Sequence, residues 1–371
     1  MSAARLWLCL VAVFTLQGAA FADDLGSHAA TGTAVYSNND GLRVISPWVQ
    51  ARQSVKGGAA LQADLKTDFI SAASVDMISG ASPRFEDVRK EAGLQAIYDN
   101  QGLGGHAGYT YSTEHDTHSH TFTLGGAREW LDRNLTTSLS YGLGMDRLGS
   151  VREPEALWHD RTSQRIDATV SQLLSRTALL SLAYTLEQIS GFQSSPYRMV
   201  PIVPKDADLW TQGHAQWVAE QHPDQRTRHG VTLEGRQALS NRLFLRALYR
   251  GYLDTWGVRA NTGEVGATYK LHHTAAVELS NRVYWQSRAS FERAMYSVER
   301  DYMTRDRRLV GQVSNSVQLT LRLRWRQWEA MVQGVGGWTR YDDFRTLVSG
   351  VFAPMPDTWT GIVQCAFSVD L

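Results

Sequence analysis

Residues 358–371 read TWTGIVQCAFSVDL, and every second residue from Trp359 onward is apolar or small. The residues between them are mostly polar, with Ile362 and Ala366 as exceptions. Successive side chains of a β-strand point to opposite faces, so this alternation predicts a strand with one apolar face and one polar face.

The same alternation recurs along the chain in segments long enough to cross a bilayer. In residues 308–325, apolar residues alternate with polar ones that include Arg322 and Arg324. A charge on the lipid face costs about 2–4 kcal/mol at the bilayer midplane, so the arginines assign the polar face to the interior. The pattern predicts about 16 strands, near residues 31–37, 43–52, 60–70, 88–98, 105–114, 119–130, 134–147, 161–174, 177–189, 227–239, 242–256, 260–272, 274–287, 308–325, 327–341 and 358–371.

The connections between these segments alternate in length. Tight turns are expected near residues 131–134, 174–176, 239–242, 272–273 and 326–327. Long links are expected near residues 148–160, 190–226, 288–307 and 342–357. Outer-membrane barrels have short periplasmic turns and long extracellular loops. The longest link, residues 190–226, is expected to cap or plug the lumen or to form an external receptor surface.

The first 22 residues have the pattern of a cleaved secretory signal peptide: Arg5, an apolar run over residues 6–16, and Ala20-Phe21-Ala22. Removing them leaves 371 − 22 = 349 residues, 23–371, in one barrel domain. The mature chain then has one cysteine, Cys365, which excludes an internal disulfide.

Composition agrees with a membrane barrel. The 37 basic and 37 acidic residues balance, so nothing indicates a nucleic-acid partner. The chain has 12 Trp and 14 Tyr although its mean hydropathy is −0.30. Lumen and lipid residues that alternate produce this average. The sequence therefore predicts an all-β, transmembrane antiparallel barrel of about 16 strands, or 14 if the first strand and a neighbour are lost, located in the cell outer membrane after export through the periplasm.

Aromatic residues mark where such a barrel would meet the two membrane interfaces. Trp328 and Trp338 share one strand face, and ten residues of a tilted strand project to roughly 25 Å along the membrane normal. Together with Trp359 they are expected to belong to the aromatic girdles. Val363, Phe367, Val369 and Leu371 are expected to form the signal read by the barrel-assembly machinery, although Leu371 stands where Phe is usual.

Several runs of sequence resemble one known family. They are Val75-Asp76-Met77-Ile78-Ser79-Gly80-Ala81-Ser82 with Arg84 and Glu86-Asp87-Val88-Arg89, Ser195-Pro196-Tyr197-Arg198-Met199-Val200-Pro201, Gln221-His222-Pro223-Asp224 with Arg226, and Asp254-Thr255-Trp256-Gly257-Val258-Arg259. These runs are similar to the domain-of-unknown-function 3570 family. The resemblance covers nearly the whole mature chain and implies a Gram-negative outer-membrane β-barrel. It implies no established activity, ligand or catalytic residue.

One predicted hairpin loop is rich in possible metal ligands. Residues 114–120 contain His115, Asp116, His118 and His120, and such a cluster could hold Zn²⁺ or Cu²⁺. The alternative is a polar hairpin tip without metal. No other cofactor is indicated.

Charged residues of both signs fall on the predicted lumen face. The candidates that line a solute path are Arg246, Arg250, Glu278, Arg282, Arg322 and Arg324. Ion pairs that link neighbouring strands are the structural interpretation of these charges, and a water-filled lumen is the functional one. The balance of sign argues against strong ion selectivity.

No catalytic motif is present, because the chain lacks Gly-x-Ser-x-Gly, His-Glu-x-x-His and a phosphate-binding glycine loop. The first hypothesis is a porin-like passive channel for small hydrophilic solutes. The second is a scaffold with a closed lumen for a periplasmic or extracellular partner, and an outer-membrane enzyme is third. Expected partners are outer-membrane lipids, lipopolysaccharide, the barrel-assembly machinery and small polar solutes.

Overall fold

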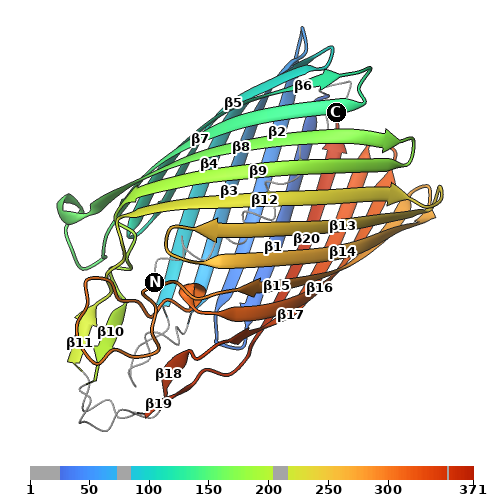
Figure 1. The fold of residues 1–371 in the computed structure, drawn as a ribbon. Coiled ribbons are helices and arrows are strands. Elements are labelled where there is room, and N and C mark those ends of the chain that lie inside the picture. The colour runs from blue at the N-terminus through green and yellow to red at the C-terminus, as the bar shows by residue number, and fades with distance from the viewer. Residues whose placement is uncertain (1–25, 73–84, 204–215, 349–350) are drawn as a thin grey trace.

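The computed structural model describes residues 26–72, 85–203, 216–348 and 351–371. Within these ranges, 16 antiparallel strands form a closed barrel, and β20 pairs with β1 to complete the ring (Figure 1). In ring order the strands are β1 (His28–Asn38), β2 (Arg43–Val55), β3 (Ala59–Ala72), β4 (Phe85–Asn100), β5 (Leu103–Glu114), β6 (Thr117–Trp130), β7 (Leu135–Leu148), β8 (His159–Ser175), β9 (Ala178–Gly191), β12 (Gln225–Ala238), β13 (Leu243–Asp254), β14 (Arg259–His272), β15 (Ala275–Gln286), β16 (Gln312–Trp325), β17 (Trp328–Tyr341) and β20 (Thr358–Asp370). The prediction of about 16 strands is confirmed.

The two faces of the wall differ as the alternation predicts. On β16, Leu319 is 54% exposed whereas its neighbour Thr320 is fully buried. The exposed face carries large apolar side chains around the ring, and the opposite face carries ion pairs between adjacent strands, such as Arg322–Glu278. Because ion pairs belong in water and not in lipid, the polar face lines the lumen.

The three predicted girdle tryptophans lie on the outward face. Trp338 is directly opposite Trp359 in the β17–β20 register, near the ends of those strands. Trp328 lies at the other end of β17 and stacks on Phe367, with ring centroids 5.0 Å apart. Aromatic side chains therefore occur on the outer wall near both ends of this strand pair.

The last strand lies between β17 and β1, so it closes the barrel. Val363 is 55% exposed and Phe367 is 44% exposed, which places the predicted assembly signal on the outward face, with Val369 in the same alternation and Leu371 at its end. On the inner side, β1 approaches its neighbours closely at Gly32. A Cβ there would lie 2.6 Å from the Cys365 carbonyl oxygen and 2.8 Å from the Trp48 ring, so only glycine fits.

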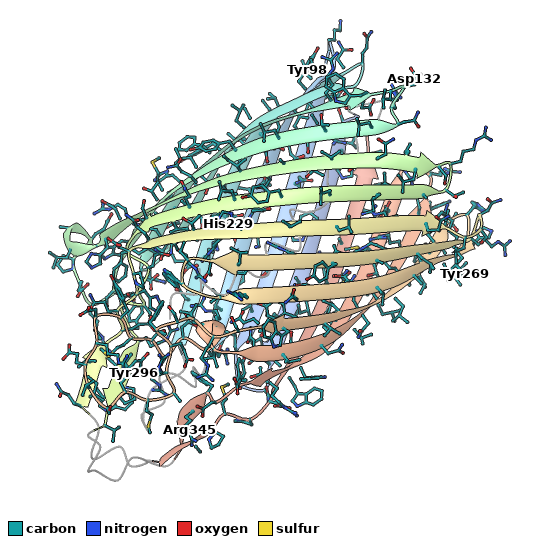
Figure 2. The ribbon with its side chains drawn as sticks, viewed as in Figure 1. Tyr98, Asp132, His229, Tyr269, Tyr296 and Arg345 are labelled. Atoms are coloured by element: carbon teal, nitrogen blue, oxygen red, sulfur yellow. The ribbon has the colours of Figure 1, made fainter. Side chains whose placement is uncertain are left out.

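The connections separate the barrel into a turn end and a loop end. At the turn end, short turns join the strands, and Leu131, Asp132 and Arg133 make one of them with φ of 53°, 54° and 69°. Figure 2 shows Tyr98, Asp132 and Tyr269 at this end. The long connections 149–158, 192–224, 287–311 and 342–357 all lie at the other end.

The long connections contain structure that the sequence did not predict. Two small hairpins, β10 (Met199–Ile202) with β11 (Gln216–Ala219) and β18 (Arg345–Val348) with β19 (Val351–Pro354), lie outside the barrel wall. Two short 3-10 helices, η1 (Glu155–Leu157) and η3 (Arg307–Leu309), accompany them. Because η3 occupies residues 307–309, β16 starts at Gln312 and the predicted start at residue 308 is wrong. No helix among the described residues has the length and hydropathy to cross a membrane.

Buried apolar residues gather at the loop end. One cluster contains Val200, Ile202, Tyr296 and Met303. A second contains Trp256, Val258, Ala289 and Leu309. A barrel with a polar lumen has no apolar centre, so the long connections supply the core of this fold.

Candidate functional site

The two longest connections fold into one unit, here called the loop cap: residues 192–203, 216–224 and 287–311. Ile202 forms a parallel bridge with Tyr296, and Gln221 forms an antiparallel bridge with Met303. The Tyr296 hydroxyl donates to the Phe291 carbonyl oxygen at 2.7 Å. Figure 1 shows β10, β11 and the segment after β15 beyond the loop end of the wall. Segments separated by about 80 residues thus share backbone hydrogen bonds and a buried core.

Arg198 lies at the polar centre of the loop cap. Its guanidinium donates to both carboxylate oxygens of Glu220, at 3.0 and 2.9 Å, and lies 3.2 Å from Asp306 Oδ2. Asp306 also accepts from Arg308. The Arg198 side chain is 2% exposed and that of Glu220 is fully buried. This arrangement joins the 192–224 connection to the 287–311 connection through buried charge.

Three more groups contact the Glu220 carboxylate: a hydroxyl, a backbone N–H and an imidazole. The Thr304 hydroxyl donates to its Oε2 at 2.8 Å, and the Ser195 N–H donates to Oε1 at 3.0 Å. His222 Nε2 lies 3.3 Å from Oε1, while its Nδ1 donates to the Gln193 carbonyl oxygen at 3.0 Å. The carboxylate therefore has the donors that a buried charge requires.

A second buried group lies beside His222. The Trp256 ring meets His222 edge-on, with centroids 5.1 Å apart, and the Arg226 guanidinium lies 4.1 Å above the Trp256 ring. Arg226 also binds Asp254, which accepts from the Tyr252 hydroxyl at 2.7 Å. The three motif runs near residues 195–201, 221–226 and 254–259 thus meet at the contact between the loop cap and the β13–β14 turn. The run at residues 75–82 lies outside the described residues.

Contacts of the loop cap reach distant parts of the rim. The Tyr197 hydroxyl accepts from the Val151 N–H at 2.9 Å and hydrogen-bonds to Asp116 in the β5–β6 turn. Arg307 lies 2.6 Å from Asp40 in the β1–β2 turn. Residues 197–198 and 306–307 are joined by the Arg198–Asp306 pair. A continuous series of contacts therefore links the β5–β6 turn to the β1–β2 turn, a quarter of the ring away.

The cap carboxylates have opposite electrostatic environments. Burial would raise the pKa of Glu220, but Arg198 and His222 outweigh it and hold the pKa well below its ordinary value. Burial would also raise the pKa of Asp306, but Arg198 and Arg308 outweigh it and hold that pKa below its ordinary value. Burial raises the pKa of Glu292 to about 7, against the partial compensation of Arg288 and Arg293. Glu292 is 1% exposed, and neither of its carboxylate oxygens accepts a hydrogen bond within the described chain.

The six predicted lumen charges lie on the polar face, in two electrostatic classes. Arg246 binds Glu264 at 2.5 Å, Arg322 binds Glu278 at 3.2 Å, and Arg324 lies 3.8 Å from Asp370. Arg250 and Arg282 have no carboxylate within 4.0 Å among the described residues. Arg250 is instead exposed to repulsion from Arg165 and Arg282. Arg246 and Arg322 are paired with glutamates of adjacent strands, and the Arg324–Asp370 pair spans β17, which lies between β16 and β20. Arg250 and Arg282 present positive charge to the lumen.

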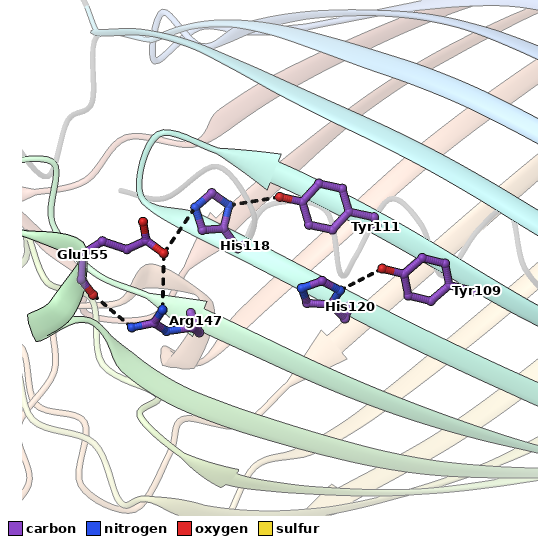
Figure 3. A pocket seen from close by; sticks show the side chains of 6 residues that line it. All are labelled: Tyr109, Tyr111, His118, His120, Arg147 and Glu155. Carbon is purple, nitrogen blue, oxygen red and sulfur yellow. Dashed lines mark hydrogen bonds and ion pairs between the residues drawn. The ribbon is translucent and has the colours of Figure 1, made fainter.

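The structure does not assemble the predicted metal set. His118 and His120 alternate outward on β6, next to Tyr111 and Tyr109 of β5. Figure 3 shows these residues with Arg147 and Glu155 in an open groove of about 540 Å³ on the outer wall. Asp116 is instead buried, at 1% exposure. His118 and His120 point to the outer side of the wall, whereas Asp116 is buried in the β5–β6 turn. The four side chains therefore do not converge on one ion.

His115 and Asp116 belong to a different cluster. His115 Nδ1 lies 2.6 Å from Asp87 Oδ1 at the start of β4. Asp87, Glu114 and Asp116 are the acidic group among the described residues whose ligand atoms lie within 4.8 Å of one another. Asp87 is 27 residues before Glu114, so spacing within the hairpin could not reveal it. The sequence singled out Asp87 only as part of the run 86–89, which resembles the domain-of-unknown-function 3570 family.

Comparisons with known proteins agree with this fold. The solved structure titled "Bacterial polysaccharide outer membrane secretin" superposes with a TM-score of 0.54 at 10% identity, covering 94% of this chain and 99% of that one. CdiB from Acinetobacter baumannii superposes with a TM-score of 0.52 at 10% identity, covering 92% of this chain but 60% of that one. A comparison with curated proteins finds no match. These identities show a shared outer-membrane barrel fold and nothing finer.

A family model places the sequence more closely. Residues 152–336, which include the β9–β12 connection and η3, match the model described as "Protein of unknown function (DUF3570)". The matched region contains Arg198, Glu220, His222 and Asp306 of the loop cap, and Trp256, which packs against it. The chain belongs to the DUF3570 family, and its fold is a 16-stranded β-barrel of the outer-membrane type.

Proposed function

We propose that this protein is a porin-like channel of the outer membrane for small hydrophilic solutes, with its loop end outside the cell. The observation that carries the proposal is the inner wall of the closed barrel, which is polar and ionised along its strands. A barrel of 16 strands is wide enough to leave an aqueous channel. The apolar outer face, with its aromatic residues near both ends, is suited to contact lipids and lipopolysaccharide.

The loop cap modifies this proposal. Its buried ion pairs join distant parts of the rim, so we propose that the cap restricts the external mouth and sets the size of the solutes that enter. The same observation favours a second candidate, a scaffold whose closed lumen serves a partner protein. The two candidates differ in what happens when the cap is shortened.

Conductance in a planar lipid bilayer tests the proposal. The wild type should conduct, and a variant with residues 193–222 replaced by a short Gly/Ser turn should conduct more. The replacement is feasible because Ser190 of β9 pairs directly with Gln225 of β12, so the wall register is kept. Heat-modifiable migration on SDS gels would verify that both barrels are folded.

A matched control shortens connection 149–158, which touches the loop cap through Val151 and Tyr197, at residues that leave Val151 in place. Trimming 149–158 at its exposed tip, around Arg152 and Glu153, should change conductance little. Folded barrels that fail to conduct with and without the cap would overturn the channel proposal. A stable co-purifying protein in that case would support the scaffold.

A further inference from the structure

Three buried carboxylates meet where β4, β5 and the β5–β6 turn come together. Asp87 is 2% exposed, Glu114 is 6% exposed and Asp116 is 1% exposed. One oxygen from each lies within 4.8 Å of the other two. Two ligands on opposite sides of a Ca²⁺ ion, each at ~2.4 Å, are ~4.8 Å apart, so the spacing is that of a coordination sphere.

Two wall strands and a tight turn bring these three side chains together. The β4–β5 ladder pairs Lys90 with Thr113 and Glu91 with Ser112, and it ends at Lys90–Thr113. Glu114 is the last residue of β5, Asp116 lies in the two-residue β5–β6 turn, and Asp87 lies near the start of β4, beyond the end of this ladder. The cluster therefore forms where the ends of β4 and β5 meet the β5–β6 turn.

The hydrogen bonds around the cluster satisfy only part of its oxygen atoms. Asp87 Oδ1 accepts from the Val88 N–H at 2.7 Å and lies 2.6 Å from His115 Nδ1. Asp116 Oδ1 accepts from the Thr117 hydroxyl at 3.0 Å. Asp116 also hydrogen-bonds to Tyr197. Oδ2 of Asp87 and Oδ2 of Asp116 are buried and accept no hydrogen bond from the residues that the structure describes. Leaving two such oxygens without a donor costs free energy that a cation between them would recover.

The other positive groups nearby do not replace a cation. Arg89, the next residue on the lumen face of β4, donates to Ser112 at 2.7 Å and to Glu91 at 2.8 Å. His115 contacts Oδ1 of Asp87, not Oδ2, and its side chain is 65% exposed.

We propose that Asp87, Glu114 and Asp116 bind a divalent cation of the calcium type. The donors are all carboxylate oxygens, which are hard ligands suited to Ca²⁺. Zn²⁺ and Cu²⁺ prefer imidazole nitrogen, and the two imidazoles of β6 face the outer wall. The bound cation would hold β4 to the β5–β6 turn and fix the carboxylate to which Tyr197 of the loop cap is bonded.

The test is a binding measurement on the full-length, detergent-solubilised protein after treatment with EDTA. Isothermal titration with Ca²⁺ should give one site per chain. Tb³⁺, which replaces Ca²⁺ and is excited through nearby tyrosine, should luminesce through Tyr197, and Tyr197→Phe should weaken that luminescence without removing a carboxylate ligand. Asp116→Asn and Asp87→Asn should each lower the Ca²⁺ affinity by about tenfold or more, because ligand charge sets affinity at such sites.

Asp68→Asn is the matched control, because Asp68 is also a 1% exposed lumen carboxylate but lies beside Lys66, outside the cluster. It should leave Ca²⁺ binding unchanged. Two independent ligand variants are used so that misfolding of one, detected by gel migration, does not decide the result. Absence of binding to the folded wild type, or equal binding to the wild type and both folded ligand variants, would overturn the proposal.

Discussion

Arg198 neutralises two buried carboxylates from different connections, Glu220 and Asp306. Removing one partner of a buried ion pair costs about 3–5 kcal/mol, because the remaining charge stays in a poorly solvated place. His222 and Arg308 still contact the two carboxylates, so we expect Arg198→Ala to fall near the lower end of that range. Hydrogen exchange in residues 192–203 and 287–311 should then accelerate while the wall strands stay protected.

A surface arginine provides the comparison for Arg198. Arg340 binds Asp357 at 3.0 Å, but its side chain is 71% exposed. Exposed pairs are weak because water and salt screen them. Arg340→Ala should therefore leave hydrogen exchange in the loop cap unchanged. If both variants behave alike, the buried pairs do not hold the cap closed.

Membrane placement of the wall can be tested at two adjacent residues of β16. Leu319 is 54% exposed on the outward face, and Gln318 faces the lumen. Leu319→Arg places a charge in lipid at about 2–4 kcal/mol and should lower the yield of assembled barrel. Gln318→Arg should assemble normally, since water hydrates the new charge. Heat-modifiable gel migration measures both, and an equal effect would mean that this face does not meet lipid.

The segment 287–311 should respond to pH through Glu292. Its pKa rises from 4.5 to about 7 on folding, so the folded protein binds a proton that the unfolded segment has released between those values. The stabilisation is present below pH 4.5 and is lost as the pH rises through about 7. At about 1.4 kcal/mol per pKa unit, the free energy of unfolding falls by on the order of 3 kcal/mol over this pH range.

Limited proteolysis of the loop cap would reveal this dependence, with faster cleavage at pH 8 than at pH 5.5. Glu292→Gln should remove most of the difference. Glu220 and Asp306 should not oppose it, because their lowered pKa values keep both ionised across that range. Faster cleavage at the lower pH in the wild type would contradict the assignment of Glu292.

The elements of the wall were predictable because a two-residue period is a local signal that repeats in each strand. The elements of the loop cap were not. β10 and β11 have four residues each, too short for an alternation to be recognised. η3 was included in the predicted strand 308–325, because Arg308 and Leu309 continue the alternation of polar and apolar residues of β16.

The candidate site depended on contacts that no local pattern encodes. Tyr197, Arg198, His222 and Trp256 were noticed through the family resemblance, but Glu220, Thr304 and Asp306 were not singled out. They are partners only because the ring brings connections near residues 220 and 305 together. In the same way, Asp87 lies near Asp116 because β4 and β5 are neighbours in the wall, and spacing within the hairpin could not reveal it.

On the scale of the whole molecule, the chain has no net charge, yet its lumen has a local excess of positive charge. Arg246 and Arg322 are neutralised by glutamates of neighbouring strands, at 2.5 and 3.2 Å. Arg250 and Arg282 have no such carboxylate within 4.0 Å among the described residues, whereas Arg165 is paired with Asp167 at 2.6 Å. A charged constriction attracts ions of opposite sign, so a conducting barrel should prefer anions modestly.

Replacing Arg250 and Arg282 with glutamine should therefore shift the reversal potential in a KCl gradient toward that of a cation-selective pore. Arg322→Gln is the matched control on the same face. Because its charge is already paired with Glu278, we expect it to alter selectivity less per charge removed and to lower thermal stability more, since Glu278 would lose its partner. If the reversal potential shifts equally per charge removed in both variants, pairing with Glu278 does not shield Arg322, and all lumen charges contribute alike to selectivity. No shift in either variant, with conductance intact, would place the solute path away from this wall.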